Sequence, residues 1–205
     1  MASSSILLAQ RLGTVLEQRK ETLAVAESCT GGLLASAITS IPGSSAWFKM
    51  GWVTYSNAAK TTQLGIKTQQ IIRHGAVSRY TVRHMAKQAL KLAGTHCSIA
   101  ISGVAGPSNS NRDNPQEVVP IGTIWIAAMH YQQPKLWVIQ QKMSGNRQQI
   151  REKSVDVAMF SLLMILVTGH CDMAHVNRHF FNFCGSYGTL STDQATALDK
   201  ILGIT

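Results

Sequence analysis

The sequence predicts an α/β protein: a three-layer sandwich with a mixed β-sheet covered by helices on both faces. Amphipathic helical segments alternate with short, partly β-branched apolar runs, as they do when helices connect parallel strands. Two of the runs, 121–130 and 135–141, are separated by a turn at 132–134, which adds an antiparallel hairpin and makes the sheet mixed. The length of 205 residues fits one compact domain.

The first part of the chain alternates helices with strands. Apolar residues spaced by three and four indicate the helices, and short runs of bulky residues indicate the strands. In chain order we predict a helix at 7–20, a strand at 22–26, a helix at 33–38, a strand at 47–55 and a helix that Asn57 caps and that carries Lys60 and Leu64. A turn at 27–32 joins the first strand to its helix, and the Pro-Gly pair at 42–43 ends that helix.

The second part of the chain completes the sheet. We predict a helix at 78–92, a buried strand at 98–102, the hairpin strands at 121–130 and 135–141, and a last long helix at about 146–168. The polar stretch 107–120 is predicted to be a loop. In sheets of this kind binding sites lie at strand ends, so the turns that follow the strands are the first places to look for chemistry.

The composition changes after residue 168. We therefore divide the chain into a domain at 1–168 and an additional C-terminal tail at 169–205. The tail contains residues of types that can ligate soft metals, namely His170, Cys171, His175, His179 and Cys184. Their spacing matches no familiar zinc site, and the neighbouring phenylalanines favour packing on the domain or on another subunit. We accordingly expect no metal and no cofactor, and we expect a homo-oligomer.

Positive charge is concentrated in one long stretch. The net charge is +9, and residues 28–112 contain nine Lys or Arg but no Asp or Glu. Such a stretch suits a phosphate-bearing small molecule or nucleic acid. Within it, Arg79, Arg83, Lys87 and Lys91 follow one another at i, i+4 positions on one helix face. This basic helix face indicates either a nucleic-acid-binding surface or an ordinary solvated face, although no nucleic-acid motif accompanies it.

The sequence favours a cytoplasmic location without membrane contact. The longest apolar run, 157–167, is shorter than the roughly 20 residues that a membrane span needs, and a buried helix explains it better. Residues 1–13 have no basic residue before their apolar patch, unlike a secretory signal. The four cysteines are scattered, so we expect reduced thiols rather than a disulfide framework.

The strand, turn and helix at 24–37 form the first candidate site. Thr30, Gly31 and Gly32 can present unpaired N–H groups to an anion at the start of a helix. The turn lacks both the Walker lysine pattern and the dinucleotide G-x-G-x-x-G pattern, so it is not an obvious nucleotide loop. A helix entry that uses glycine only for packing is the alternative.

Ser28 is a candidate nucleophile if a base lies near it. No acid between Ser28 and Arg112 can complete a local Ser-His-Asp arrangement, so a lysine is the candidate base. A lysine base must lose its proton near neutral pH, which burial favours and nearby carboxylates oppose. Lys60 lies in the acid-free stretch, and Tyr55 can relay or donate a proton. A solvated surface lysine is the alternative for Lys60.

Cys29 is the rival nucleophile because a helix entry can lower the pKa of a thiol. Successive residues on an extended strand end point in opposite directions, so we do not expect Ser28 and Cys29 to face the same substrate.

Six short motifs occur in one order along the chain. They are Ala26-Glu27-Ser28-Cys29-Thr30-Gly31-Gly32, Ile41-Pro42-Gly43-Ser44-Ser45, Val53-Thr54-Tyr55-Ser56-Asn57-x-x-Lys60, Leu64-Gly65-Ile66, His74-Gly75-Ala76-Val77-Ser78 and Ser102-Gly103-x-Ala105-Gly106-Pro107. With these motifs the chain resembles the CinA C-terminal domain family, which includes nicotinamide mononucleotide deamidase. The resemblance covers about residues 5–168.

The resemblance implies amide hydrolysis without a metal, in which nicotinamide mononucleotide becomes nicotinic acid mononucleotide and ammonia in pyridine-nucleotide salvage. By position it implies Ser28 as the nucleophile, Lys60 as its base and Tyr55 as a proton-handling partner. N–H groups around Thr30 and Gly31 then stabilise the oxyanion that forms during attack.

The resemblance also extends to substrate-binding positions. Ser102 and Gly103 stand where the family usually has Thr-Gly, and Arg147 stands where the family has an arginine after Gly-Asp. We assign all three to substrate binding, with Arg147 as a phosphate clamp because guanidinium presents paired donors to phosphate. A surface arginine that opens the last helix is the alternative. Asn146 replaces the family's Asp, and the loop at 108–113 replaces a glycine-rich loop.

Overall fold

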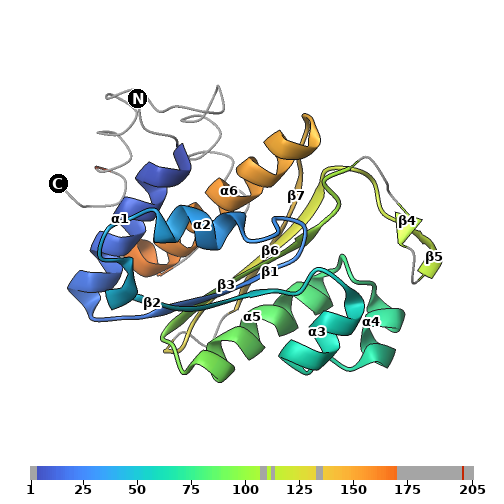
Figure 1. The fold of residues 1–205 in the computed structure, drawn as a ribbon, viewed down its shortest axis with the longest axis horizontal. Helices are drawn as coiled ribbons and strands as arrows, with labels where there is room; N and C mark the ends of the chain where they lie inside the picture. Colours follow the sequence, from blue (N-terminus) through green and yellow to red (C-terminus); the bar gives the residue numbers. More distant parts are fainter. Residues whose placement is uncertain (1–3, 107–109, 112–113, 133–135, 170–199, 201–205) are drawn as a thin grey trace.

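The computed structural model describes residues 4–106, 110–111, 114–132, 136–169 and 200. A five-stranded sheet with the order β2-β1-β3-β6-β7 forms its centre (Figure 1). The strands are β1 (Leu23–Glu27), β2 (Phe48–Val53), β3 (Cys97–Gly103), β6 (Thr123–His130) and β7 (Trp137–Lys142). β1 runs parallel to β2 and β3, whereas β6 is antiparallel to β3 and to β7. The sheet is therefore mixed, as predicted.

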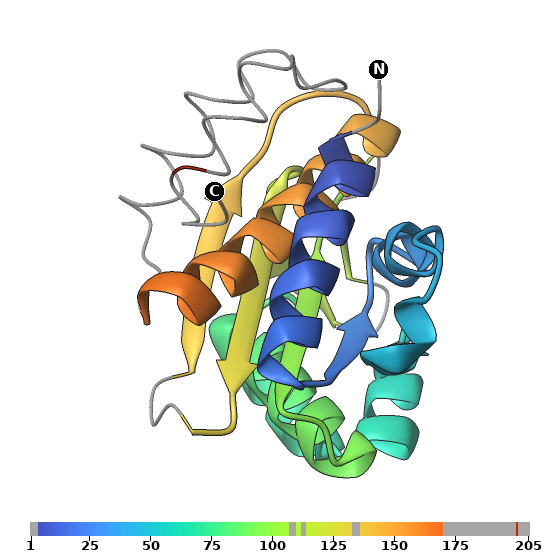
Figure 2. The ribbon, with the colours of Figure 1, turned by 90° about the vertical axis from the view of Figure 1, so that its left-hand side faces the viewer.

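Helices cover both faces of the sheet (Figures 1 and 2). One face carries α1 (Ser4–Arg19), α2 (Leu33–Thr39) and α6 (Arg147–Thr168), and the other carries α3 (Asn57–Leu64), α4 (Thr68–His74) and α5 (Arg79–Ala93). A short 3₁₀ turn, η1 (Ser44–Ala46), precedes β2. The three-layer sandwich predicted from the sequence is confirmed.

Alternation along β1 divides the core into two layers. Leu23 and Val25 pack with α1, α2 and α6, whereas Ala24 and Ala26 pack with α5. Most of α6 is buried, which confirms the buried helix predicted for the apolar run at 157–167. Among the described residues, no helix has both the length and the apolar character needed to cross a membrane.

Three local predictions from the sequence differ from the structure. The stretch predicted as a loop contains a small antiparallel pair, β4 (Ser110–Asn111) and β5 (Asn114–Val118). The predictions did not include α4, whose only buried residue is Ile71 and which therefore has little apolar periodicity. The cap of α3 is Ser56 rather than Asn57, because the Ser56 backbone is extended and its Oγ accepts the Ala59 N–H at 3.0 Å.

The predictions for the tail stay untested. His170, Cys171, His175, His179 and Cys184 lie outside the described residues, as does much of the loop at 108–113.

Candidate active site

The candidate site lies at the edge of the sheet where β1 and β3 end. Ser28 follows β1 directly, and its N–H donates to Ile101 O at 3.0 Å, which fixes it beside the end of β3. On the other side, Thr54 N donates to Glu27 O at 2.8 Å, so the chain that leaves β2 stays against the same edge. Because α3 starts immediately afterwards, its residue Lys60 returns to this edge.

Ser28 and Lys60 meet in a buried position. Lys60 Nζ lies 3.0 Å from Ser28 Oγ and 2.8 Å from Thr54 O, and Lys60 is only 1% exposed. The structure therefore removes the alternative of a solvated lysine. As a neutral amine, Lys60 can donate one hydrogen to Thr54 O and receive the Ser28 hydroxyl proton on its lone pair. This is the geometry of a nucleophile hydrogen-bonded to its base.

Glu27 holds the turn that carries Ser28, a role that sequence reasoning missed. Its fully buried carboxylate accepts N–H groups from Gly32 at 3.0 Å, Leu34 at 3.1 Å and Ala35 at 2.9 Å. The carboxylate thus does the work of an N-cap for α2, where Gly32 has no side chain to offer. A buried acid at the end of a strand, next to a Gly-Gly helix entry, was the available signal.

The three predicted anion-binding positions differ in what their N–H groups do. Gly32 N donates to Glu27, and Gly31 N donates to Ser28 O at 3.1 Å. In the described part of the chain, Thr30 N has no acceptor, and the buried Thr30 Oγ1 has no partner either. Thr30 is therefore the position at which the fold leaves polar atoms without partners, although the residue is fully buried, and the assignments of Thr30, Gly31 and Gly32 stay predictions.

Tyr55 and Arg147 meet next to Thr54, whose carbonyl oxygen contacts Lys60 Nζ. The Tyr55 side chain is exposed, and its hydroxyl accepts a hydrogen bond from Arg147 Nη2 at 2.8 Å, while Arg147 Nη1 donates to Gly106 O. No hydrogen bond joins Tyr55 to Ser28 among the described residues. Arg147 is exposed and is the first residue of α6, as its alternative has it, and these two contacts hold its side chain beside Tyr55 and Gly106. Its assignment to substrate binding stays a prediction.

Arg151 is a second arginine at the site that sequence reasoning missed. It lies one helical turn after Arg147, and its Nη2 donates to Thr30 O at 2.7 Å. The same nitrogen lies 3.5 Å from the position that a Cβ on Gly31 would occupy. The i, i+4 spacing of the two arginines at the start of a helix was the signal that could have found it.

Ser102 and Gly103 form the β3 side of the site. Ser102 is buried, and its hydroxyl donates to Ala76 O at 2.8 Å, which holds the loop before α5. A Cβ on Gly103 would lie 2.7 Å from Thr123 O, so only glycine fits against β6 there. Both residues thus have a structural role, and their assignment to substrate binding stays a prediction.

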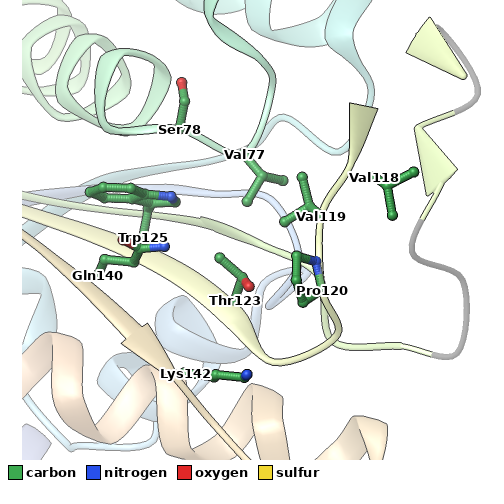
Figure 3. Close-up of a pocket in the computed structure, with 9 residues that line it drawn as sticks. All are labelled: Val77, Ser78, Val118, Val119, Pro120, Thr123, Trp125, Gln140 and Lys142. Atoms are coloured by element: carbon green, nitrogen blue, oxygen red, sulfur yellow. The ribbon is translucent and has the colours of Figure 1, made fainter. Parts of the chain in front are cut away.

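A cavity of about 610 Å³ opens one strand beyond Ser102 (Figure 3). Trp125, the register partner of Ser102 on β6, lines this Trp125 cavity, and Lys142 contributes a cation. The other lining residues are Val77, Ser78, Val118, Val119, Pro120, Thr123 and Gln140. Because alternate residues share a sheet face, the cavity and Ser28 lie on the same face.

Cys29 is not in a position to compete with Ser28. Its side chain is buried in the layer formed with α1, α2 and α6. Burial raises the pKa of the Cys29 thiol to about 12, so the reactive thiolate is scarce at neutral pH. The expectation that Ser28 and Cys29 point in opposite directions agrees with these surroundings.

Known proteins share this arrangement of the chain. Residues 6–166 match the CinA C-terminal domain family. The chain is 40% identical to nicotinamide-nucleotide amidohydrolase PncC of Shigella flexneri, over 79% of this chain and 95% of the relative. It is 39% identical to the PncC protein of Escherichia coli strain K12, again over 79% of this chain and 95% of the relative.

Solved structures extend the similarity to the fold. A CinA superfamily protein from Klebsiella pneumoniae superimposes with a TM-score of 0.73 at 32% identity, covering 80% of this chain and 98% of that protein. The competence/damage inducible protein CihA from Agrobacterium tumefaciens gives a TM-score of 0.72 at 33% identity, covering 81% of this chain and 97% of that protein.

Proposed function

This chain belongs to the CinA C-terminal domain family, and we propose that it is an amidohydrolase that converts nicotinamide mononucleotide into nicotinic acid mononucleotide and ammonia. The amidohydrolase relatives at about 40% identity support this reaction. The observation that carries the proposal is the buried hydrogen bond between Ser28 Oγ and Lys60 Nζ at 3.0 Å.

In the first half of the reaction, Ser28 becomes acylated. Lys60 Nζ takes the hydroxyl proton as Ser28 Oγ attacks the carboxamide carbon, which gives a tetrahedral oxyanion. The N–H of Thr30, which has no acceptor among the described residues, stabilises the negative oxygen as it forms. Lys60 then returns the proton to the amide nitrogen, the carbon–nitrogen bond breaks, and ammonia leaves.

In the second half, water releases the product. Lys60 removes a proton from a water molecule that attacks the acyl carbon, the bond to Ser28 Oγ breaks, and the proton passes to Ser28. This step gives the carboxylic acid, which loses its proton to solvent, so the nucleotide leaves as a carboxylate. Thr54 O, which lies 2.8 Å from Nζ, keeps the amine oriented towards Ser28 in both halves.

The substrate phosphate is assigned to the arginines of α6. Arg147 presents a planar pair of donors beside the exposed Tyr55, and Arg151 stands one turn further along the helix. Tyr55 passes protons between the site and the solvent. Thr30, Gly31 and Gly32 line the turn, and Ser102 and Gly103 form the wall towards β3.

The test is ammonia release from a panel of amides by the purified protein. We expect turnover of nicotinamide mononucleotide, and we expect Ser28→Ala to abolish it and Lys60→Met to lower kcat by about 10²–10⁴-fold. Cys29→Ser is the matched control, because Cys29 neighbours Ser28 in sequence but lies in the other core layer. Full turnover in Ser28→Ala would sink the mechanism, and a folded protein without turnover would sink the proposed reaction.

The basic helix face supports a second candidate function. Arg79, Arg83, Lys87 and Lys91 are all exposed, and no described carboxylate forms an ion pair with any of them. If this face binds nucleic acid, affinity for generic duplex DNA falls steeply with salt, and Arg83→Glu with Lys87→Glu removes it without changing ammonia release. Salt-independent or absent binding identifies an ordinary solvated face.

Two further properties belong to the proposal. The free thiols of Cys29 and Cys97 suit a reducing compartment, so we assign the enzyme to the cytoplasm. We also assign it a homo-oligomeric state, which light scattering of the purified chain tests directly.

A further inference from the structure

Three residues whose side chains can ligate a metal meet at the edge of the sheet opposite Ser28. Glu21 precedes β1, Cys97 begins β3 and His130 ends β6. All three are buried, and their ligand atoms lie within 4.8 Å of one another. Cys97 and His130 are direct register partners on neighbouring strands, so the sheet itself brings the thiol and the imidazole together.

The spacing of these atoms matches a tetrahedral metal site. With ordinary bond lengths to zinc, an imidazole nitrogen and a carboxylate oxygen on one ion are about 3.3 Å apart, and a thiolate sulfur and an oxygen are about 3.6 Å apart. His130 Nε2 lies 3.0 Å from Glu21 Oε1, and Cys97 Sγ lies 3.9 Å from the other carboxylate oxygen, Oε2. Because the two distances involve different oxygens, the carboxylate must turn to bring one oxygen between the thiol and the imidazole, whose ligand atoms lie within 4.8 Å of it.

Two features of the same cluster decide how an ion binds there. His130 is only 2% exposed, and it faces the cluster with Nε2, while its Nδ1 has no hydrogen-bond partner among the described residues and can keep the ring proton when Nε2 binds an ion. Arg19 contacts Glu21 through Nε at 3.0 Å and Nη2 at 3.2 Å. Arg19 therefore occupies both oxygens of Glu21 and also donates to Leu166 O at 3.3 Å, so an ion binds only if the guanidinium gives up one oxygen and stays on the other as an outer partner.

We propose that Glu21, Cys97 and His130 form a structural site for a single zinc ion. One carboxylate oxygen, one thiolate and one imidazole nitrogen are the mixed donor set that Zn²⁺ takes in preference to hard cations such as Mg²⁺. The site joins the chain before β1 to β3 and β6, and water completes the coordination. It lies outside the proposed active site and does not depend on the proposed reaction.

Binding has a defined proton balance. The Cys97 thiol loses its proton to solvent, because the thiolate is the ligand, and Zn²⁺ occupies Nε2 of the neutral His130 ring, whose proton then resides on Nδ1. The thiolate and the Glu21 carboxylate together neutralise the two positive charges of the ion. No redox step is involved.

The test is titration of the full-length, metal-free protein with Co²⁺ as a spectroscopic substitute for Zn²⁺. We expect a thiolate-to-cobalt charge-transfer band that saturates at one equivalent and disappears when Zn²⁺ is added. Cys97→Ser should abolish the band, and His130→Gln should weaken Zn²⁺ binding by more than about 100-fold, the upper end of what loss of an outer-shell partner costs.

The matched controls separate this cluster from the cysteines of the tail. Cys171→Ser with Cys184→Ser, and separately Cys29→Ser, should keep the full charge-transfer band. The thermal unfolding midpoint supplies a second measurement: Zn²⁺ should raise it in the unaltered protein, and His130→Gln should lose that increment whatever its own midpoint.

The same experiments identify the outcomes that overturn the proposal. A band that survives Cys97→Ser but disappears with the tail cysteines locates the metal in the tail. No band and no Zn²⁺-dependent increment mean that the cluster is a buried polar network without a metal. Ammonia release by folded Cys97→Ser should equal that of the unaltered protein, and its loss would contradict a purely structural site.

Discussion

Where β1 ends, the buried amine of Lys60 contacts the Ser28 hydroxyl and the Thr54 carbonyl. Where β1 begins, Glu21 is bound by Arg19 and His130, so charges are paired within the fold. In the proposed mechanism the amine at the first edge exchanges a proton with Ser28, whereas the second edge holds its charges in mutual contact. On that proposal burial tunes a reactive group at one edge and stabilises an ion-pair network at the other.

The backbone around each edge reinforces this difference. At the catalytic edge, the carboxylate of Glu27 is occupied by three N–H groups of α2. Its negative charge is stabilised by N–H groups at the start of α2. At the other edge, burial alone would raise the pKa of Glu21, but the hydrogen bonds from Arg19 and His130 together lower it.

The largest expected effect is a loss of activity that only a change at the Lys60 edge should cause. Lys60→Met should lower kcat by about 10²–10⁴-fold, the usual contribution of a general base. The thermal midpoint should stay equal or rise, because an apolar side chain of similar length replaces a buried polar one. Steady-state ammonia release and thermal unfolding measure the two quantities. A large loss of stability with normal kcat would make Lys60 a structural residue.

The next effect is a loss of stability, without a loss of activity, when the Glu21 edge is changed. Glu21→Ala leaves Arg19 and the buried His130 without their acceptor, and we expect it to lower the free energy of unfolding by about 2 kcal/mol. Urea unfolding in the presence of a chelator measures this without metal effects. The kcat of the folded variant should be unchanged, and a fall comparable to that of Lys60→Met would erase the distinction between the edges.

Glu27→Gln tests whether the hydrogen bonds of Glu27 stabilise the edge that carries Ser28. An amide offers one acceptor oxygen where the carboxylate offers two, so at least one N–H of α2 loses its partner. We expect a loss of about 1–2 kcal/mol in unfolding free energy. The turn that carries Ser28 should loosen and reduce kcat about tenfold, a modest misplacement effect. Glu27→Asp should recover neither property, because its shorter side chain falls short of α2.

Much of the fold follows from local sequence patterns, but the contacts at both edges do not. Strand and helix periodicity predicted the sheet, and the motif resemblance brought Ser28 and Lys60 together. Glu27 escaped notice because helix caps are sought among short polar residues immediately before a helix. Glu21, Cys97 and His130 are far apart in sequence, and only the strand order and register bring them into contact.

A smaller effect locates the substrate phosphate relative to the catalytic edge. Arg147→Ala should raise KM about tenfold with kcat little changed, as expected when a charge-assisted contact of about 1.4 kcal/mol is lost. Lys142→Ala is the matched control, since Lys142 is the cation that lines the Trp125 cavity. The reverse pattern, with KM raised only by Lys142→Ala, would place the phosphate in that cavity instead.

The smallest effect concerns the sign of the pH dependence of two buried carboxyls. Glu21 has a pKa below its ordinary value of 4.5, so its contribution to stability is present above that pH and is lost as the pH falls. Asp156, buried on α6 and bonded by Ser4 and Ser5, is the opposite case: burial raises its pKa from 3.8 to about 6.

The contribution of Asp156 is therefore present below about pH 3.8 and is lost as the pH rises through about 6. Unfolding free energies of Glu21→Gln and Asp156→Asn, measured from acid to neutral pH against the unaltered protein, should diverge in opposite directions. The stability lost in Glu21→Gln should grow with pH, whereas the stability lost in Asp156→Asn should shrink. If the stability lost in both variants changed with pH in the same direction, the contacts of Glu21 with Arg19 and His130 would not lower its pKa, and Glu21 would behave like Asp156.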